Sequence, residues 1–397
     1  MMKINTKTIF TTSVVLIPIL SMYKFIGSSI DLGLALTTVT LLITLATHKD
    51  RIKLKRPQTP WVLYVFIIWA STFFAVFFPF SSSLSTIIGR ALRNILCVLI
   101  FIAGSSGNCF NGEKAKKIYL FVVRAATLYI FFQTFAARLF NIVVPGYVGL
   151  LIRKVSYVVD LQLTSASTYR PSSFFYEPSH YFIYVVVAFT VFLFSRKDKQ
   201  NIFWACFISG GIILSGSSMG VFTTGVLWGI WFFRLLLKNI KYRKICVNHM
   251  IILMFLCLAI FFLSRSTRFA NILVRVFNNN AQGGNAISGR ASGYLAIHSM
   301  PVLNLLFGYG FGNLPMNFYS SLNFYPSFLY NFLCMGILGT GVTFLALRNV
   351  YKRVNNWSAK LAFFVYILLC FYGETFMSTY LVFFMFLFQY SNDSLDF

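Results

Sequence analysis

The segment "WVLYVFIIWASTFFAVFFPF", residues 61–80, contains no charged side chain. A helix of about 20 apolar residues is long enough to cross the hydrocarbon core of a bilayer. The rest of the 397-residue chain is similar, because 58% of its residues are hydrophobic and only 11% are charged, whereas soluble domains contain about 25% charged residues. The sequence therefore predicts an all-α, polytopic membrane protein with a single integral membrane domain over residues 1–397.

Further apolar stretches flank this segment on both sides, and together they predict about 12 transmembrane helices. The other eleven are residues 8–25, 30–47, 87–107, 118–137, 180–195, 202–217, 219–237, 250–263, 324–347, 361–374 and 376–390. The first has the flanks of a signal peptide, but it lacks a small-residue cleavage site and is followed by more spans. We therefore expect it to be retained.

The connectors between these stretches carry most of the positive charge. Five basic connectors, with Lys3, Lys7 and Arg234, hold 22 of the 34 Lys and Arg residues. They are "HKDRIKLKR" (48–56), "GEKAKK" (112–117), "SRKDKQ" (195–200), "KNIKYRK" (238–244) and "RNVYKRVNNWSAK" (348–360). All five fall on one side of the membrane if both termini are cytoplasmic, as the positive-inside rule requires.

Two connectors on the opposite, outer side are much longer than the rest, at about residues 138–179 and 264–323. Long loops in a compact fold usually carry function. Residues 140–163 mix apolar and charged side chains, which favours a helix lying in the membrane interface. Residues 265–300 contain a Gly/Asn-rich break between two expected short helices.

Neither the cysteines nor the acidic residues predict a metal site. The seven cysteines all lie in expected spans or on the cytoplasmic side, and they form no CxxC pair or Cys/His zinc spacing. The acidic residues expected on the outer side are Asp31, Asp160, Glu177 and Glu374. None of them forms the Asp-x-Asp pair that metal-dependent sugar transfer often uses. We therefore expect no metal and no cofactor.

The basic residues outside the five connectors are mostly arginine. They are Lys24, Arg90, Arg93, Arg124, Arg138, Arg153, Lys154, Arg170, Arg265, Arg268, Arg275 and Arg290. Arginine binds phosphate with two parallel hydrogen bonds and stays charged in poorly hydrated sites. The outer face is thus suited to an anionic, lipid-linked ligand, and the net charge of +25 does not indicate a nucleic-acid partner. The alternative is that these arginines snorkel to lipid headgroups and pair with the outer acids.

Three of these arginines have expected positions within spans. Arg90 and Arg93 are three residues apart on one helix face, where phosphate contact and ion pairing both remain open. Arg124 lies two turns inside a span, where a charge at the centre costs about 2.5–3.5 kcal/mol. Snorkelling remains open for Arg124 because the basic residues 114–117 are close in sequence.

The stretch "RPSSFFYEPSHY", residues 170–181, places Arg170, Glu177 and His180 at the mouth of an apolar run. One interpretation is contact with a substrate. The other is structural: Glu177 and Pro178 mark the start of a helix, and Arg170 forms an ion pair with Glu177.

The second outer loop offers similar alternatives. Arg290 precedes His298 by eight residues, about two helical turns, so the two would share an approximate helix face. The segment "GYGFG" (308–312) contains the glycines of a phosphate-cradling loop, but it follows no expected strand, which favours a simple turn.

The sequence also resembles a known family. "YRPSSFFYEPSHY" (169–181) is similar to the R-x-x-S-x-F-x-E-P-S signature of the O-antigen polymerases (Wzy) and related capsule and exopolysaccharide polymerases. "SGRASGY" (288–294), "FGYGFGN" (307–313) and "FLYNFLCMGILGTG" (328–341), with an N-x-L-x-x-G-x-x-G passage, follow in the family's order. The similarity covers roughly residues 165–345. Tyr325–Tyr330 departs from it, because many relatives carry a histidine before that asparagine.

The resemblance implies an inverting, metal-independent glycosyltransferase of lipopolysaccharide or other polysaccharide biosynthesis in the bacterial inner membrane. It would transfer the growing glycan from undecaprenyl diphosphate to the non-reducing end of a new lipid-linked repeat unit, on the periplasmic or outer side. Its partners would be undecaprenyl-diphosphate-linked glycans, the lipid bilayer, a chain-length regulator and a flippase.

The expected roles follow from this chemistry. Arginines would neutralise the charge on the diphosphate leaving group, and Glu177 or His298 would act as the general base. The expected catalytic residues are Glu177, Arg170, Arg290 and His298, and the expected substrate-binding residues are Arg90, Arg93, His180, Arg275, Gly308, Gly310 and Asn331. Two alternatives are an O-antigen ligase, which shares the donor, and a lipid-linked oligosaccharide flippase or other transporter. The two long outer loops argue against a transporter.

Overall fold

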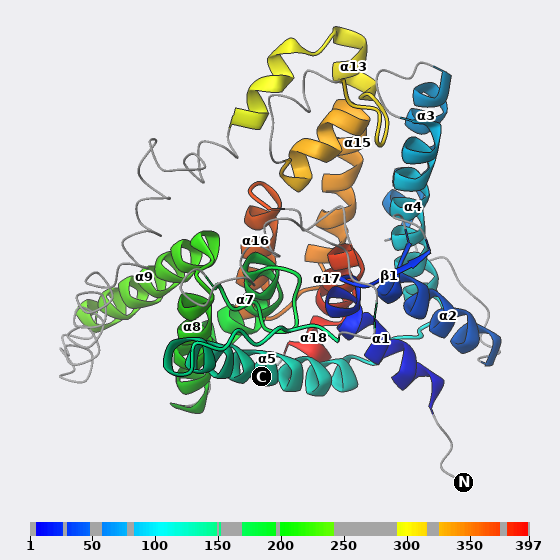
Figure 1. Ribbon diagram of the computed structural model, residues 1–397. Coiled ribbons are helices and arrows are strands. Elements are labelled where there is room, and N and C mark those ends of the chain that lie inside the picture. The colour runs from blue at the N-terminus through cyan, green and yellow to red at the C-terminus, as the bar shows by residue number, and fades with distance from the viewer. Residues whose placement is uncertain are drawn as a thin grey trace.

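The computed structural model of the chain describes residues 5–26, 30–47, 58–77, 83–148, 151, 169–195, 199–241, 292–315, 325–373 and 379–395. These ranges contain fourteen helices and one two-stranded antiparallel sheet (Figure 1). The elements are α1 (Thr6–Leu20), β1 (Lys24–Ile26), β2 (Ile30–Asp31), α2 (Leu32–Thr47), α3 (Thr59–Phe77), α4 (Leu84–Ser106), α5 (Gly112–Leu139), α7 (Pro178–Phe194), α8 (Lys199–Ser215), α9 (Ser218–Lys241), η2 (Ser292–Ser299), α13 (Val302–Phe307), α15 (Ser327–Tyr351), α16 (Trp357–Cys370), α17 (Thr379–Gln389) and α18 (Ser391–Ser394).

The helical class predicted from the sequence is confirmed. Eleven of the twelve predicted spans coincide with helices, and the stretch 250–263 lies outside the described residues. Within the described ranges, five helices are long and apolar enough to cross a membrane: α3, α4, α5, α9 and α15. The other six apolar helices have 10–17 residues. These lengths indicate a multi-pass membrane protein, in which five helices of the described ranges reach the length of a span.

Polar side chains fix where several helices begin. Asp31 Oδ1 accepts a hydrogen bond from the backbone N–H of Leu34 at 2.9 Å at the start of α2. Asn111 caps α5 in the same way through the N–H of Lys114 at 2.9 Å. The first N–H groups of a helix have no partner within the helix, so such caps stabilise the helix start by about 1 kcal/mol.

The long helices run in more than one direction. In Figure 1, α3, α4 and α15 stand side by side, with α13 against the upper end of α15, whereas α5 runs across the lower part of the view. Helix α7 lies near the middle, packed against α5, α8, α9 and α16. The segment around Glu177 therefore leads directly into the interior.

Helix α7 is buried on every side. Every residue from Tyr181 to Phe194 is buried, as expected of a helix that is apolar all round. The hydroxyl of Tyr119, on α5, enters its backbone: it donates to the carbonyl of Tyr184 at 2.8 Å and accepts from the N–H of Ala188 at 3.1 Å. A side chain thus bridges two backbone groups that are four residues apart and would pair directly in a regular helix.

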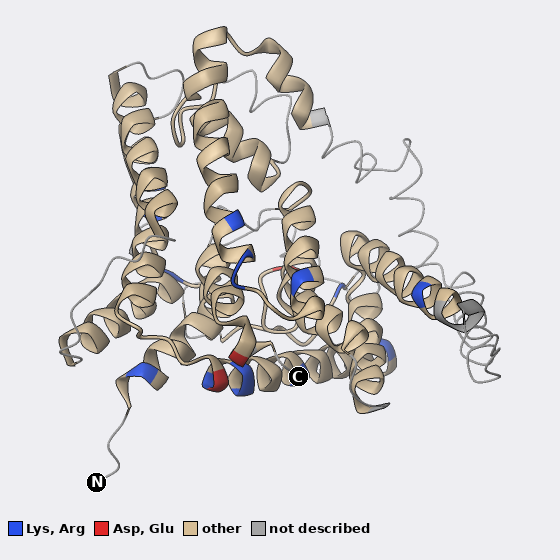
Figure 2. Cartoon of the chain, turned by 180° about the vertical axis from the view of Figure 1, so that it is seen from behind, with Lys and Arg blue, Asp and Glu red and all other residues tan. Residues whose placement is uncertain are grey.

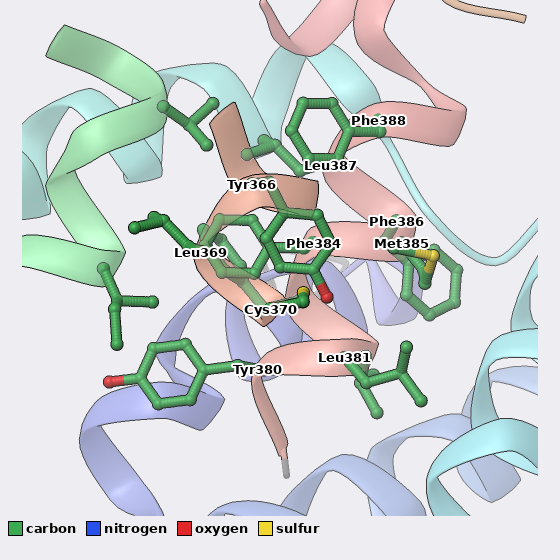
Figure 3. Close-up of a cluster of buried hydrophobic side chains, with 14 of the residues drawn as sticks. Tyr366, Leu369, Cys370, Tyr380, Leu381, Phe384, Met385, Phe386, Leu387 and Phe388 are labelled. Carbon is green, nitrogen blue, oxygen red and sulfur yellow. The ribbon is translucent and has the colours of Figure 1, made fainter. Parts of the chain in front are cut away.

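Aromatic rings fill the core around α16 and α17. The rings of Tyr366 and Phe384 lie 4.4 Å apart between centroids, and Figure 3 shows them overlapping at the centre of a buried cluster. Phe386 contacts Phe10 of α1, Phe101 of α4 and Phe110 at centroid distances of 5.5, 5.3 and 4.9 Å. Aromatic pairs at such distances stabilise a core beyond the area they bury.

The outer surface of several helices is also apolar. On α3, the residues Phe66, Trp69, Phe73, Phe74 and Phe77 are each 57–67% exposed. Acidic side chains are few and basic side chains are scattered over separate elements among the described residues (Figure 2). Exposed apolar faces of this extent are what a lipid environment requires.

Helix α15 is a hairpin rather than a straight rod. Gly336 interrupts it with φ 64° and ψ −162°, a conformation that favours glycine. The chain then folds back, because the amide of Asn331 donates to the hydroxyl of Thr343 at 2.9 Å. In a straight helix these residues would lie about 18 Å apart along the axis. The predicted span 324–347 is therefore two helical arms joined by a sharp reversal at Gly336.

Candidate functional site

Glu177 is the N-cap residue of α7, directly before Pro178 at the first helical position. Its side chain does not cap the helix, however, and it accepts only a 3.4 Å hydrogen bond from the hydroxyl of Ser179. The carboxylate is partly exposed. Among the residues that the structure describes, it has no ion-pair partner within 4 Å.

The guanidinium of Arg170 contacts Gly216 and not Glu177. Its Nη2 donates to the carbonyl oxygen of Gly216 at 2.6 Å. Gly216 follows the end of α8 and adopts a positive φ of 67°. The contact fixes the guanidinium to the turn between α8 and α9, so the structural ion pair between Arg170 and Glu177 is not formed among the described residues.

Ser173 lies between these two residues in an unusual conformation. Its φ is 57°, a backbone conformation that is energetically unfavourable for a residue other than glycine. Residues with such strained backbones cluster at functional sites. Its N–H donates to Gln133 Oε1 of α5 at 2.9 Å, while its buried hydroxyl has no partner in the described part of the chain. Phe175 is buried against Tyr181 and Tyr184. The turn is therefore anchored on both sides, and Glu177 projects from a fixed backbone.

His180 lies one turn further into α7. Its imidazole packs edge-on against Tyr380 of α17 at a centroid distance of 5.5 Å and lies 5.9 Å from the ring of Tyr176. The hydroxyl of Tyr380 donates to the backbone carbonyl of His180 at 3.3 Å. These contacts attach the entrance of α7 to α17.

A second group of expected site residues meets at the glycine-rich loop after α13. The N–H groups of Tyr309 and Gly310 donate to the carbonyls of Leu333 and Cys334, both at 2.8 Å. A Cβ atom on Gly308, whose φ is 78°, would collide with the backbone of Cys334. The loop thus forms backbone hydrogen bonds with the first arm of α15. This geometry is that of a structural turn, the favoured reading of "GYGFG".

Arg90 joins this loop from α4. Its Nη1 donates to the hydroxyl of Tyr330 at 3.3 Å, and the same hydroxyl accepts from the N–H of Gly312 at 3.3 Å. The Arg90 side chain is exposed. It therefore combines an anchored position with access from outside, as a phosphate-binding arginine needs.

Arg93, one turn deeper, forms an ion pair. Its Nη2 lies 3.0 Å from Asp31 Oδ2, and the side chain of Asp31 is fully buried. Of the two roles left open for Arg93, the structure shows ion pairing. The contact links α4 to the start of α2.

Asn331 lies inside the α15 hairpin and is fully buried. Besides Thr343, it contacts α3, since its Oδ1 accepts from the hydroxyl of Tyr64 at 3.1 Å. Both ends of its amide are thus used within the protein. Asn331, a candidate substrate-binding residue, therefore forms hydrogen bonds that stabilise the hairpin.

The remaining candidates lie partly outside the described residues. Arg275 and Arg290 are outside them, as is Glu374. His298 is exposed near the end of η2, a 3₁₀-helix with about 3.0 residues per turn. Arg290 and His298 were expected to share a face of one α-helix. Residues 292–299 do not form an α-helix, so the described part of the chain offers no such face. Residues 140–148 and 151, the described part of the expected interfacial helix, are also irregular.

Helix η2 is fastened to the end of α16. The hydroxyl of Tyr294 donates to the carbonyl of Phe371 at 2.9 Å. Burial, with smaller effects from Tyr372 and Cys370, raises the pKa of Tyr294 to about 12, so this phenol remains a hydrogen-bond donor at neutral pH. His298 is thereby carried on a short helix with a fixed attachment.

Several contacts of the expected site residues were not evident from the sequence. Gly216 and Tyr330 receive the guanidinium groups of Arg170 and Arg90, and Gln133 holds the turn at Ser173. Each lies at least 40 residues away along the chain. The signals available were the Ser/Gly-rich break at residues 215–218 and Tyr330 directly before Asn331. No group of three or more His, Cys, Asp or Glu side chains gathers in the described ranges.

A comparison of the sequence with known protein families and with curated proteins finds no match to either.

Proposed function

We propose that this protein is a polysaccharide polymerase of the O-antigen type. It would be a membrane-embedded, inverting glycosyltransferase acting on two lipid-linked glycans. The observation that carries the proposal is the Glu177 carboxylate, which has no ion-pair partner among the described residues and projects from an anchored turn. It lies in the segment that resembles the polymerase signature.

The proposed reaction uses this carboxylate as the general base. A hydroxyl group of the acceptor sugar attacks the anomeric carbon of the donor glycan, and its proton passes to Glu177. The bond between that carbon and the diphosphate oxygen breaks, and undecaprenyl diphosphate departs with the electron pair. Guanidinium groups stabilise the charge on the leaving diphosphate. Arg170 and the exposed Arg90 are the described candidates for this role, with Arg275 and Arg290 as further candidates outside the described residues.

The direct test compares two glutamates at helix N-termini. Glu177→Gln keeps the size and polarity of the side chain but cannot take a proton, so turnover of purified lipid-linked repeat units should fall by about 10²–10⁴-fold. Glu113→Gln is the matched control, because Glu113 is exposed in the first turn of α5, and should leave turnover unchanged. A normal polymer ladder from Glu177→Gln would contradict the proposal.

A transporter is the second candidate, and one observation favours it. Discontinuous helices such as the α15 hairpin form the substrate sites of many transporters. Gel display of lipid-linked glycan in a deletion strain separates the functions. Single repeat units should accumulate if the protein is a polymerase, long lipid-linked chains if it is a ligase, and little outer-face material if it is a flippase.

The proposed location is the bacterial inner membrane, with both termini cytoplasmic and the active site on the outer side. Reporter fusions at residues 52, 115, 198, 241 and 353 should then read cytoplasmic, because these positions lie in or next to the basic connectors. Fusions at residues 160 and 285 should read external. A cytoplasmic signal at residue 285 would contradict this topology.

A further inference from the structure

Arg124 has an unusual environment for a charged residue in an apolar helix. It lies near the middle of α5, and its guanidinium carbon is 4.2 Å from the centre of the Trp204 ring of α8. A guanidinium over an indole face is stabilised by a cation–π interaction. Among the described residues, Arg124 has no carboxylate partner. Its positive charge is therefore only partly compensated.

Two hydrogen-bond donors at this contact are also left without acceptors. Arg124 Nε and Trp204 Nε1 are both buried atoms with no partner in the described part of the chain. Both groups can only donate, because neither guanidinium nor indole N–H has an acceptor function. A buried donor without an acceptor is costly. Arg124 Nη1 and Nη2 are not among these buried atoms, so they can meet an external anion that compensates the charge.

The surroundings of Arg124 show which kind of molecule can reach it. Phe121 and Leu128 lie one turn to either side on the same face of α5 and are 71% and 58% exposed. On α8, Phe203 beside Trp204 is 61% exposed. The pair therefore opens onto an apolar outer surface. A ligand with long hydrocarbon chains and an anionic head would cover both parts.

Basic residues near Arg124 indicate where the anionic headgroup of such a ligand would lie. Lys117 is exposed seven residues before Arg124, two turns away on the same face, which is about 10 Å along the helix. Helix α8 likewise begins at Lys199, five residues before Trp204 and within the basic connector 195–200. Both approaches come from the end predicted to be cytoplasmic, where anionic lipids concentrate.

We propose that Arg124 and Trp204 form a binding site for the phosphate of an anionic phospholipid from the surrounding bilayer. The acyl chains lie along Leu128 and Phe203, and the phosphate oxygens accept from the Nη groups of Arg124, which the Trp204 ring holds in place. This site is independent of the proposed polymerase activity. It gives the intramembrane arginine a function in lipid recognition.

The test measures lipids retained by the full-length protein. The purified protein is exchanged into an equimolar mixture of phosphatidylglycerol and phosphatidylcholine, and bound lipids are counted by native mass spectrometry. The wild type should retain phosphatidylglycerol several-fold over phosphatidylcholine. Arg124→Gln should abolish this preference, and Trp204→Phe, which weakens the cation–π contact that positions the guanidinium, should reduce it.

The matched control is Arg138→Gln, which removes the same charge from an exposed position in the last turn of α5. It should retain the wild-type preference. Equal retention of both lipids by the wild type would overturn the proposal, as would an unchanged preference in a folded Arg124→Gln variant. If Arg124→Gln does not fold, Trp204→Phe decides: a wild-type preference in this variant leaves only a structural cation–π contact.

Discussion

The amide nitrogen of Asn331 lies 2.9 Å from the hydroxyl of Thr343, although twelve residues separate them. This distance is possible only because the chain reverses at Gly336. The same asparagine accepts from Tyr64 of α3. One buried amide therefore holds the two arms of the hairpin together and attaches them to a neighbouring helix.

Replacing Asn331 should destabilise the hairpin. Asn331→Ala removes both hydrogen bonds from a fully buried position, and each lost partner costs about 1–3 kcal/mol. We expect a lower melting temperature in detergent. Thr343→Val should show part of the loss, while Asn392→Ala, at an exposed position, should show none. A normal melting temperature with lost activity would instead assign Asn331 to the substrate.

The junction between the glycine loop and the hairpin should not tolerate any side chain. A Cβ atom on Gly336 would collide with the backbone of Leu306, and one on Gly308 would collide with that of Cys334. Gly336→Ala and Gly308→Ala should therefore give little folded protein after size-exclusion chromatography. Gly229→Ala is the control, because a Cβ there meets nothing within 4 Å and alanine favours the helix. Equal yields from all three would contradict this packing.

Arg93 and Arg90 should respond differently to removal. Arg93→Ala takes the cation away from the fully buried Asp31, and a buried charge that loses its partner is strongly destabilising. Arg90→Ala removes an exposed side chain that donates a long hydrogen bond to Tyr330. We expect a clear drop in melting temperature for the first and a small one for the second. Polymer synthesis should fall in Arg90→Ala at nearly normal stability.

Arg170 and Glu177 should contribute independently to stability. The described contacts place Arg170 on Gly216, and Glu177 has no ion pair with any residue that the structure describes. In a double-mutant cycle with alanine at both positions, the coupling free energy should be below about 0.5 kcal/mol. A coupling free energy above about 1 kcal/mol would instead show that Arg170 and Glu177 form the structural ion pair. In activity, Arg170→Lys should remain impaired, because lysine keeps the charge but loses the planar fork.

Hydropathy predicted the helices well and their contacts poorly. The stretch 118–137 lies inside α5, because apolar composition over one segment is a local property. The Arg93–Asp31 pair joins residues 62 apart, and composition gives no information about such distances. The hairpin at Gly336 was missed for a related reason: both arms are apolar, so hydropathy shows one continuous span. Arg124 was recognised as costly, but its partner Trp204 follows only from the packing of α5 on α8.

The hydroxyl of Tyr119 in the backbone of α7 has a mechanical consequence. Sliding α5 along α7 would break the hydrogen bonds to both Tyr184 and Ala188. These two hydrogen bonds therefore oppose sliding between α5 and α7. Arg124 lies on α5 and Glu177 directly before α7, so the contact at Tyr119 fastens together the two helices that carry these residues.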